Sequence, residues 1–108
     1  MEKKTSIVFV SEKLEKQFEK LNENEELKKY LRRAIEDIKQ NPFCGTKIQQ
    51  KLFPKEYIKK YHITNLWKYD LPKAWRIIYT LINENEAELL SIILEWFNHK
   101  EYEMRFNY

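Results

Sequence analysis

Residues 75–97 read WRIIYTLINENEAELLSIILEWF, and this stretch decides the fold of the chain. Residues 75–82 and 88–97 are rich in β-branched and aromatic side chains, which predicts two strands. The polar residues 83–86 between them predict a turn, so the two strands form an antiparallel hairpin. Both segments are apolar at odd and even positions alike, which indicates a sheet that is covered on both faces.

The segments before this hairpin extend it into an α+β fold. Residues 66–71 predict a further strand that leads into a turn at Pro72, and residues 5–10 predict a strand near the N-terminus. Apolar residues at helical spacing predict two helices, the first following Ser11 and the second ending before Asn41. The order is β-α-α-β-β-β, which predicts a helical hairpin packed on one face of a small, mainly antiparallel four-stranded sheet.

Residues 42–64 are the segment with the weakest pattern. They predict a loop with a short helical turn near residues 55–61, and a loop of that length in a compact domain is usually functional. Between residues 47 and 62 stand five lysines and two tyrosines, with Glu56 as the only acid. Such a patch binds phosphates with little sequence preference, and it equally fits a plain solvated surface.

Length and composition bound the class of protein. The 108 residues predict a single domain, residues 1–108. Cys44 is the only cysteine and the chain has two histidines, a set without metal-ligand spacing, so neither a metal nor a cofactor is expected. The net charge of +3 is compatible with an anionic partner. No apolar run approaches the roughly 20 residues needed to cross a bilayer, and no signal-peptide core is evident, so we expect a cytoplasmic protein without a membrane partner.

The C-terminal residues 96–108 combine a histidine, basic side chains and aromatic rings. A terminus without a role is normally polar and poor in aromatic residues, because chain ends fray. The residue types therefore indicate a site for phosphate binding or for acid–base chemistry, with His99 as its proton-handling member. Phe106 and Tyr108 fit anchors that dock the tail on the sheet.

This order of elements resembles the RelE/ParE superfamily of toxin–antitoxin toxins. In that family an arginine lies on a central strand, here Arg76, and the last strand leads into a tail with a histidine, a basic residue and a tyrosine, here His99, Lys100 and Tyr102. The resemblance covers essentially the whole chain and is sharpest over residues 65–105.

The resemblance implies a toxin of a type II toxin–antitoxin pair that acts as a metal-independent, ribosome-dependent mRNA endonuclease. In such enzymes the 2′-hydroxyl of the RNA attacks the adjacent phosphate. The implied partners are a cognate antitoxin, the ribosome and mRNA. Carried over residue by residue, Arg76 would hold the scissile phosphate, His99 would be a general acid or base, and Tyr102 would stack or handle a proton. The implied phosphate-binding side chains are Lys68, Lys73, Lys100 and Arg105.

Other interpretations stay open. Arg76 equally fits an ion pair with Asp70 or Glu95, and His99 equally fits a surface histidine or a cap on the last strand. For the whole chain, the alternatives are a ParE-like member that poisons DNA gyrase, an inactive relative of these toxins, or a plain RNA-binding module.

Overall fold

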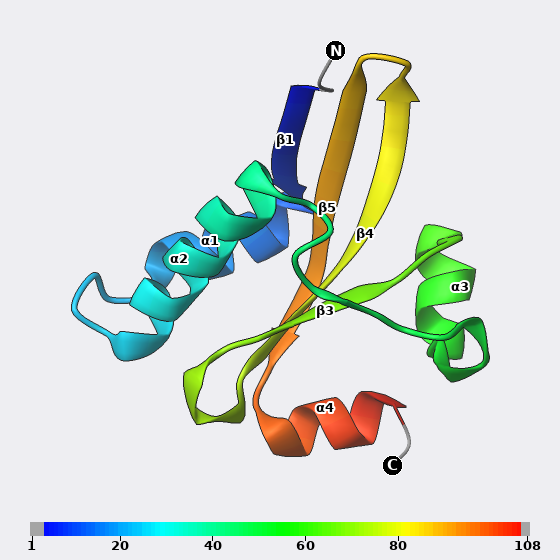
Figure 1. Ribbon diagram of the computed structural model, residues 1–108. Helices are drawn as coiled ribbons and strands as arrows, with labels where there is room; N and C mark the ends of the chain where they lie inside the picture. The colour runs from blue at the N-terminus through cyan, green and yellow to red at the C-terminus, as the bar shows by residue number, and fades with distance from the viewer. Residues whose placement is uncertain (1–3, 107–108) are drawn as a thin grey trace.

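The fold is built around a long antiparallel hairpin of two ten-residue strands, β4 (Arg76–Asn85) and β5 (Glu88–Phe97). In the computed structural model, which describes residues 4–106, this hairpin is the centre of a five-stranded sheet (Figure 1). The other elements are β1 (Lys4–Phe9), α1 (Glu12–Lys20), α2 (Glu26–Gln40), β2 (Thr46–Lys47), α3 (Lys55–Tyr61), β3 (Trp67–Asp70), α4 (His99–Phe106) and the 3₁₀ turns Gln50–Leu52 and Pro72–Ala74. The strand order is β1-β5-β4-β3-β2.

The α+β class is confirmed, and the prediction of a four-stranded sheet was wrong. β1 pairs parallel with β5, the other neighbouring strands pair antiparallel, and β2 adds a fifth strand. β2 has only two residues, which is too short to show an alternating pattern. Its place is set by pairing with Trp67 and Lys68 of β3, and a contact of this kind is not encoded locally in the sequence.

Two helices join the predicted helical hairpin. The short turn expected near residues 55–61 is α3, and the C-terminal tail forms α4, which the predicted order β-α-α-β-β-β did not contain. Phe106 is buried against the ring of Tyr102, with 4.5 Å between the ring centroids, so it anchors the tail as expected. Tyr108 lies outside the described residues. None of the described helices has both the length and the apolar surface for a membrane crossing.

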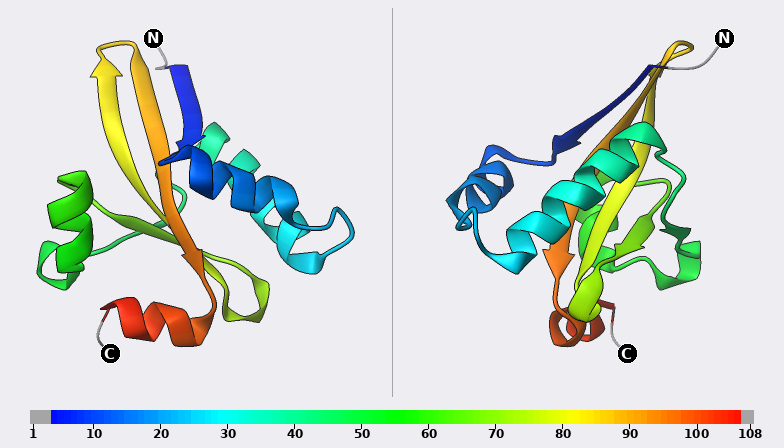
Figure 2. Two further views of the ribbon diagram at one scale, coloured as in Figure 1. Left: turned by 180° about the vertical axis from the view of Figure 1, so that it is seen from behind. Right: turned by 60° about the vertical axis from the view of Figure 1, so that its left-hand side comes forward.

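The sheet carries a separate apolar core on each face. The helical pair α1 and α2 covers one face, and α3 and α4 lie on the other (Figure 2). Successive residues of β4 alternate between the two cores: Ile77 and Tyr79 face the helical pair, whereas Ile78 faces α3 and α4. This double covering is the physical reason why β4 and β5 are apolar at both parities.

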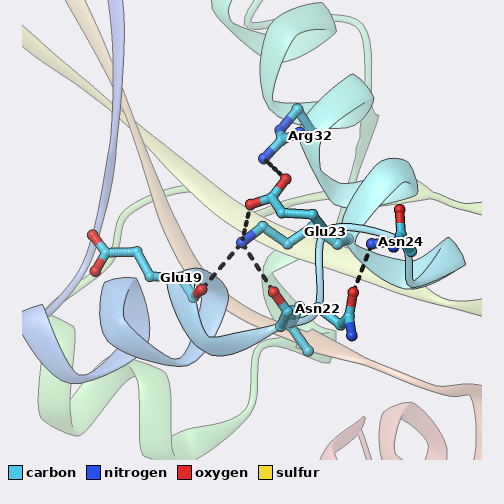
Figure 3. Close-up of polar contacts among 7 residues, drawn as sticks. Glu19, Asn22, Glu23, Asn24 and Arg32 are labelled. Carbon is cyan, nitrogen blue, oxygen red and sulfur yellow. Dashed lines mark hydrogen bonds and ion pairs between the residues drawn. The ribbon is translucent and has the colours of Figure 1, made fainter.

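The turn between α1 and α2 is held by a buried cation. Lys28 is only 3% exposed, and its ammonium group donates to the backbone carbonyl oxygens of Glu19 and Leu21, each at 3.2 Å. It also pairs with the carboxylate of Glu23, which binds Arg32 in turn at 2.7 Å (Figure 3). The lysine thus satisfies carbonyl groups that the end of α1 leaves without helical partners.

The single glycine of the chain fixes the segment after α2. The backbone N–H of Gly45 donates to the hydroxyl oxygen of Tyr79 at 3.1 Å, and that hydroxyl donates to the carbonyl oxygen of Pro42 at 2.8 Å. A Cβ atom at position 45 would lie 2.5 Å from the carbonyl oxygen of Lys68. Only glycine allows the backbone to approach β3 this closely, and this approach leads directly into β2.

Candidate functional site

Arg76 begins β4 at the end of the sheet where β3 and β5 also meet α4. Its backbone is paired with Asp70 on β3 and with Phe97 on β5. The side chain is 17% exposed, and its Nε lies 3.4 Å from Oδ1 of Asp70, a carboxylate that is itself 63% exposed. Nη1 of the guanidinium donates to the carbonyl oxygen of Ala74 at 3.2 Å. The arginine is therefore oriented by a turn and a carboxylate while it stays near solvent.

A two-residue turn carries this carbonyl group. Lys73 and Ala74 both have positive φ, 60° and 62°, in the left-handed region that non-glycine residues adopt at a cost. The turn connects β3 to β4, and two consecutive left-handed residues are typical of tight hairpin turns. Its conformation aims the Ala74 carbonyl oxygen at Arg76.

α4 places His99 beside this arginine. The helix begins with a reciprocal cap: the backbone N–H of Glu101 donates to Oδ1 of Asn98 at 2.9 Å, and the backbone N–H of Asn98 donates to Oε1 of Glu101 at 3.1 Å. The cap turns the chain sharply at the end of β5, so His99 opens the helix directly over the strand ends. Its Nδ1 lies 3.2 Å from Nη1 of Arg76.

The contacts of His99 define the roles of its two ring nitrogens. A guanidinium carries only donors, so Nδ1 of His99 must accept from Arg76 and cannot carry a proton in this arrangement. The Nε2–H group donates a hydrogen bond to the carboxylate of Glu103, one helical turn later. The imidazole is thereby held with its Nδ1 lone pair directed at Arg76 and with its proton on the side of Glu103.

The ring of Tyr102 packs against the cationic groups of Arg76 and Lys68. This ring is 3% exposed, and the guanidinium carbon of Arg76 lies 4.5 Å from the ring centroid. Nζ of Lys68 lies 5.8 Å from the same centroid. Two cations thus gather on one buried ring, an arrangement that cation–π attraction stabilises. With so little of the ring exposed, its faces hold cations and leave little surface for stacking on a base.

The structure divides the predicted site residues into two groups. Arg76, His99, Tyr102 and Lys68 lie together. Lys73 instead pairs with Glu26 at the start of α2, a hydrogen bond that raises the pKa of Lys73.

The other two cations of the predicted set lie on α4. Lys100 is exposed next to His99, and no polar contact of its side chain is found within residues 4–106. Arg105 faces away from His99 and pairs with Glu56 and Glu95, the latter at 3.3 Å. Burial lowers the pKa of Arg105, but Glu95, Tyr57 and Glu56 outweigh it and the pKa is raised. Arg105 is therefore bound in a separate ion-pair cluster.

The lysines of residues 47–60 do not join the site. All five are exposed, on β2, the 3₁₀ turn Gln50–Leu52 and α3. The tyrosine between them, Tyr57, is 2% exposed and packs on Phe106, so it serves the core. The second tyrosine, Tyr61, is partly buried against the same core, and Nζ of Lys60 lies 5.3 Å from its ring centroid. The lysines form a solvated positive surface.

Sequence reasoning missed Glu103. It lies four residues after His99, a spacing that brings two side chains together on a helix. A prediction that the tail is helical would therefore have pointed to Glu103 as a partner of His99. In the described part of the chain, no group of three histidine, cysteine or carboxylate side chains is arranged to hold a metal ion.

Comparisons with known proteins returned no similar sequence or structure. No protein-family model matches the chain, and neither a curated protein nor a solved structure matches it. The geometry of the site itself is therefore the basis for its chemistry.

Proposed function

We propose that this protein is the toxin of a type II toxin–antitoxin pair of the RelE/ParE kind, and that it cleaves ribosome-bound mRNA in the cytoplasm without a metal ion. The observation that supports the proposal is the 3.2 Å contact between Nη1 of Arg76 and Nδ1 of His99. It joins a group suited to hold a phosphate to a group suited to move a proton.

Phosphate binding would activate the histidine. In the free protein the guanidinium of Arg76 donates to Ala74 and His99 and pairs with Asp70. A phosphodiester offers charged oxygens in the bidentate geometry that a guanidinium prefers, so it would draw Arg76 away from the neutral imidazole nitrogen. Nδ1 of His99 would then be free to accept a proton from the 2′-hydroxyl of the RNA.

The bond changes balance without a further reactant. The 2′-oxygen attacks phosphorus as its proton passes to Nδ1 of His99, and the charge that develops on the phosphate is stabilised by Arg76. The bond from phosphorus to the 5′-oxygen breaks, and the leaving oxygen takes a proton from an ammonium group. We assign this role to Lys68, whose Nζ lies 5.8 Å from the ring centroid of Tyr102. The products are a 2′,3′-cyclic phosphate and a 5′-hydroxyl end.

Glu103 would assist as a positioning residue. Its carboxylate fixes the proton on Nε2, so Nδ1 is the nitrogen that faces the phosphate, and it balances the positive charge that His99 gains on taking the proton. The role requires no contact between Glu103 and the RNA.

The test is inducible expression with mapping of RNA 5′ ends, for the wild type beside His99→Ala. We expect new 5′ ends within translated mRNA for the wild type and their loss in the variant. The matched control is His62→Asn, which changes the other histidine, an exposed residue in the left-handed conformation at the end of α3. Intact mRNA with the wild type would overturn the proposal, and stalled DNA gyrase in the same cells would identify the ParE-like alternative.

A further inference from the structure

β1 accompanies only the first part of β5. It pairs with residues 88–93, and the last bond of this edge runs from the N–H of Val10 to the carbonyl oxygen of Ile93, at 2.9 Å. The chain then turns at Ser11 into α1 and leaves the sheet. β5 continues to Phe97, and in Figures 1 and 2 its second half runs on past the end of β1. Among the described residues, no strand pairs with residues 94–97 on the side away from β4.

A groove of about 650 Å³ opens along this unpaired edge. α1 contributes Leu14 and Gln17 to one wall, and α4 contributes Met104, which is 71% exposed, to the other. The volume lies within the range of about 300–1,000 Å³ that is typical of ligand sites. An open strand edge inside such a groove presents backbone donors and acceptors to whatever enters it.

The two faces of the sheet give the groove two different linings. On the face of the helical pair the lining is apolar, with Leu14, Trp75 and Trp96 packed against the core beneath α1 and α2. On the opposite face the lining is acidic: Glu56 and Glu95 pair with Arg105, and Glu101 adds a third carboxylate to the lining. The groove therefore carries a net negative charge within a chain whose total charge is +3.

This division specifies the occupant. Side chains of a strand point alternately to the two faces of a sheet, so a strand added beside β5 meets tryptophan on one side and carboxylates on the other. We propose that the groove binds an extended segment of a partner protein in which apolar and basic residues alternate. This segment is added as a further strand to the second half of β5, residues 94–97. The backbone edge supplies affinity and the two linings select the side chains.

The groove lies on the side of α4 opposite His99, since Arg105 and Met104 line it while His99 contacts Arg76. Binding there does not depend on the proposed nuclease activity. The two proposals can therefore fail separately.

The probe is an acetylated, amidated hexapeptide of alternating valine and lysine, titrated into the isotope-labelled protein. We expect the amide resonances of residues 94–97 to shift. Methylation of every second backbone nitrogen of the peptide should weaken binding at least about tenfold, because it removes ladder hydrogen bonds. Exchange of the lysines for glutamates should weaken it by a similar factor, because it places like charges opposite the acidic lining.

A pair of matched variants locates the site. Gln17→Arg adds a positive charge to the wall of the groove and should reduce the affinity for the lysine peptide at least about threefold. Gln40→Arg makes the same change at an exposed position near the end of α2 and should leave the affinity unchanged.

Any of the following results would overturn the proposal. The first is the absence of binding at millimolar peptide. The second is equal binding of the methylated peptide, or resonance shifts confined to the outer edge of β1. The third is self-association of the protein alone through residues 94–97, which would assign the edge to a second copy of the chain.

Discussion

Arg76→Lys separates the proposed catalytic role of Arg76 from its structural role. The variant keeps the positive charge at the start of β4 and removes the planar, bidentate fork. If Arg76 holds the scissile phosphate and also occupies Nδ1 of His99, a lysine can do neither in the same geometry. Removal of one such preorganised donor typically lowers a rate constant by about 10²–10³-fold, and we expect a loss of that size in mRNA cleavage.

The structural cost is smaller and can be worked out from the contacts. The cation–π contact with the buried ring of Tyr102, at 4.5 Å, is worth about 1–2 kcal/mol. The ion pair with Asp70 contributes about 0–1 kcal/mol, because that carboxylate is 63% exposed. The hydrogen bond to the carbonyl oxygen of Ala74 adds about 1 kcal/mol. A lysine retains part of the first two, so we expect a loss of about 1–2 kcal/mol from an unfolding free energy of about 5–15 kcal/mol.

The assay pairs ribosome-dependent cleavage of a labelled mRNA with urea unfolding of the same preparations. The matched control is Arg33→Lys, which makes the same exchange at an exposed position of α2, away from the site. A folded Arg76→Lys protein that cleaves within about tenfold of the wild type would refute the phosphate-clamp assignment. A stability loss above about 4 kcal/mol would show that Arg76 is mainly structural.

Three further predictions concern stability. Gly45→Ala should lower the unfolding free energy by about 1–3 kcal/mol in urea titrations, because its Cβ would lie 2.5 Å from the carbonyl oxygen of Lys68; an unchanged midpoint would contradict the close approach. Ala74→Gly should raise the unfolding free energy by about 0.5 kcal/mol. Relief of the left-handed conformation gains about 1–2 kcal/mol, which exceeds the entropy cost of glycine, about 0.5–1 kcal/mol. A lower unfolding free energy in the variant would show that the turn is unstrained. The hydroxyl of Tyr69 donates to Asp37 at 2.5 Å, and this bond, with burial, raises the pKa of Tyr69 to about 12, above the value of about 10 expected when unfolded. The stabilisation is therefore complete below pH 10 and is lost as the pH rises towards 12. Across this pH range the unfolding free energy should fall more in the wild type than in Tyr69→Phe. Parallel curves of unfolding free energy against pH would contradict the linkage.

The candidate site was only partly visible in the sequence. Arg76, His99 and Tyr102 were expected together, and the contacts of Arg76 with His99 and with the ring of Tyr102 bring them together. Lys73 and Arg105 carry the expected charge but pair with carboxylates elsewhere, because a charged side chain binds whichever opposite charge the fold places near it. Such pairings join residues far apart in the chain, so no local pattern reports them.

The sequence by itself determined four of the five strands, the helical pair and the α+β class. These follow from hydrophobic periodicity, which each segment carries independently of the rest of the chain. The tertiary structure alone decided that β1 runs parallel to β5, that two residues near Gly45 add a fifth strand, and that the tail folds as α4 against the far face. Each of these depends on backbone pairing or burial between distant segments. The same dependence places His99 against Arg76 and leaves the second half of β5 with an open edge.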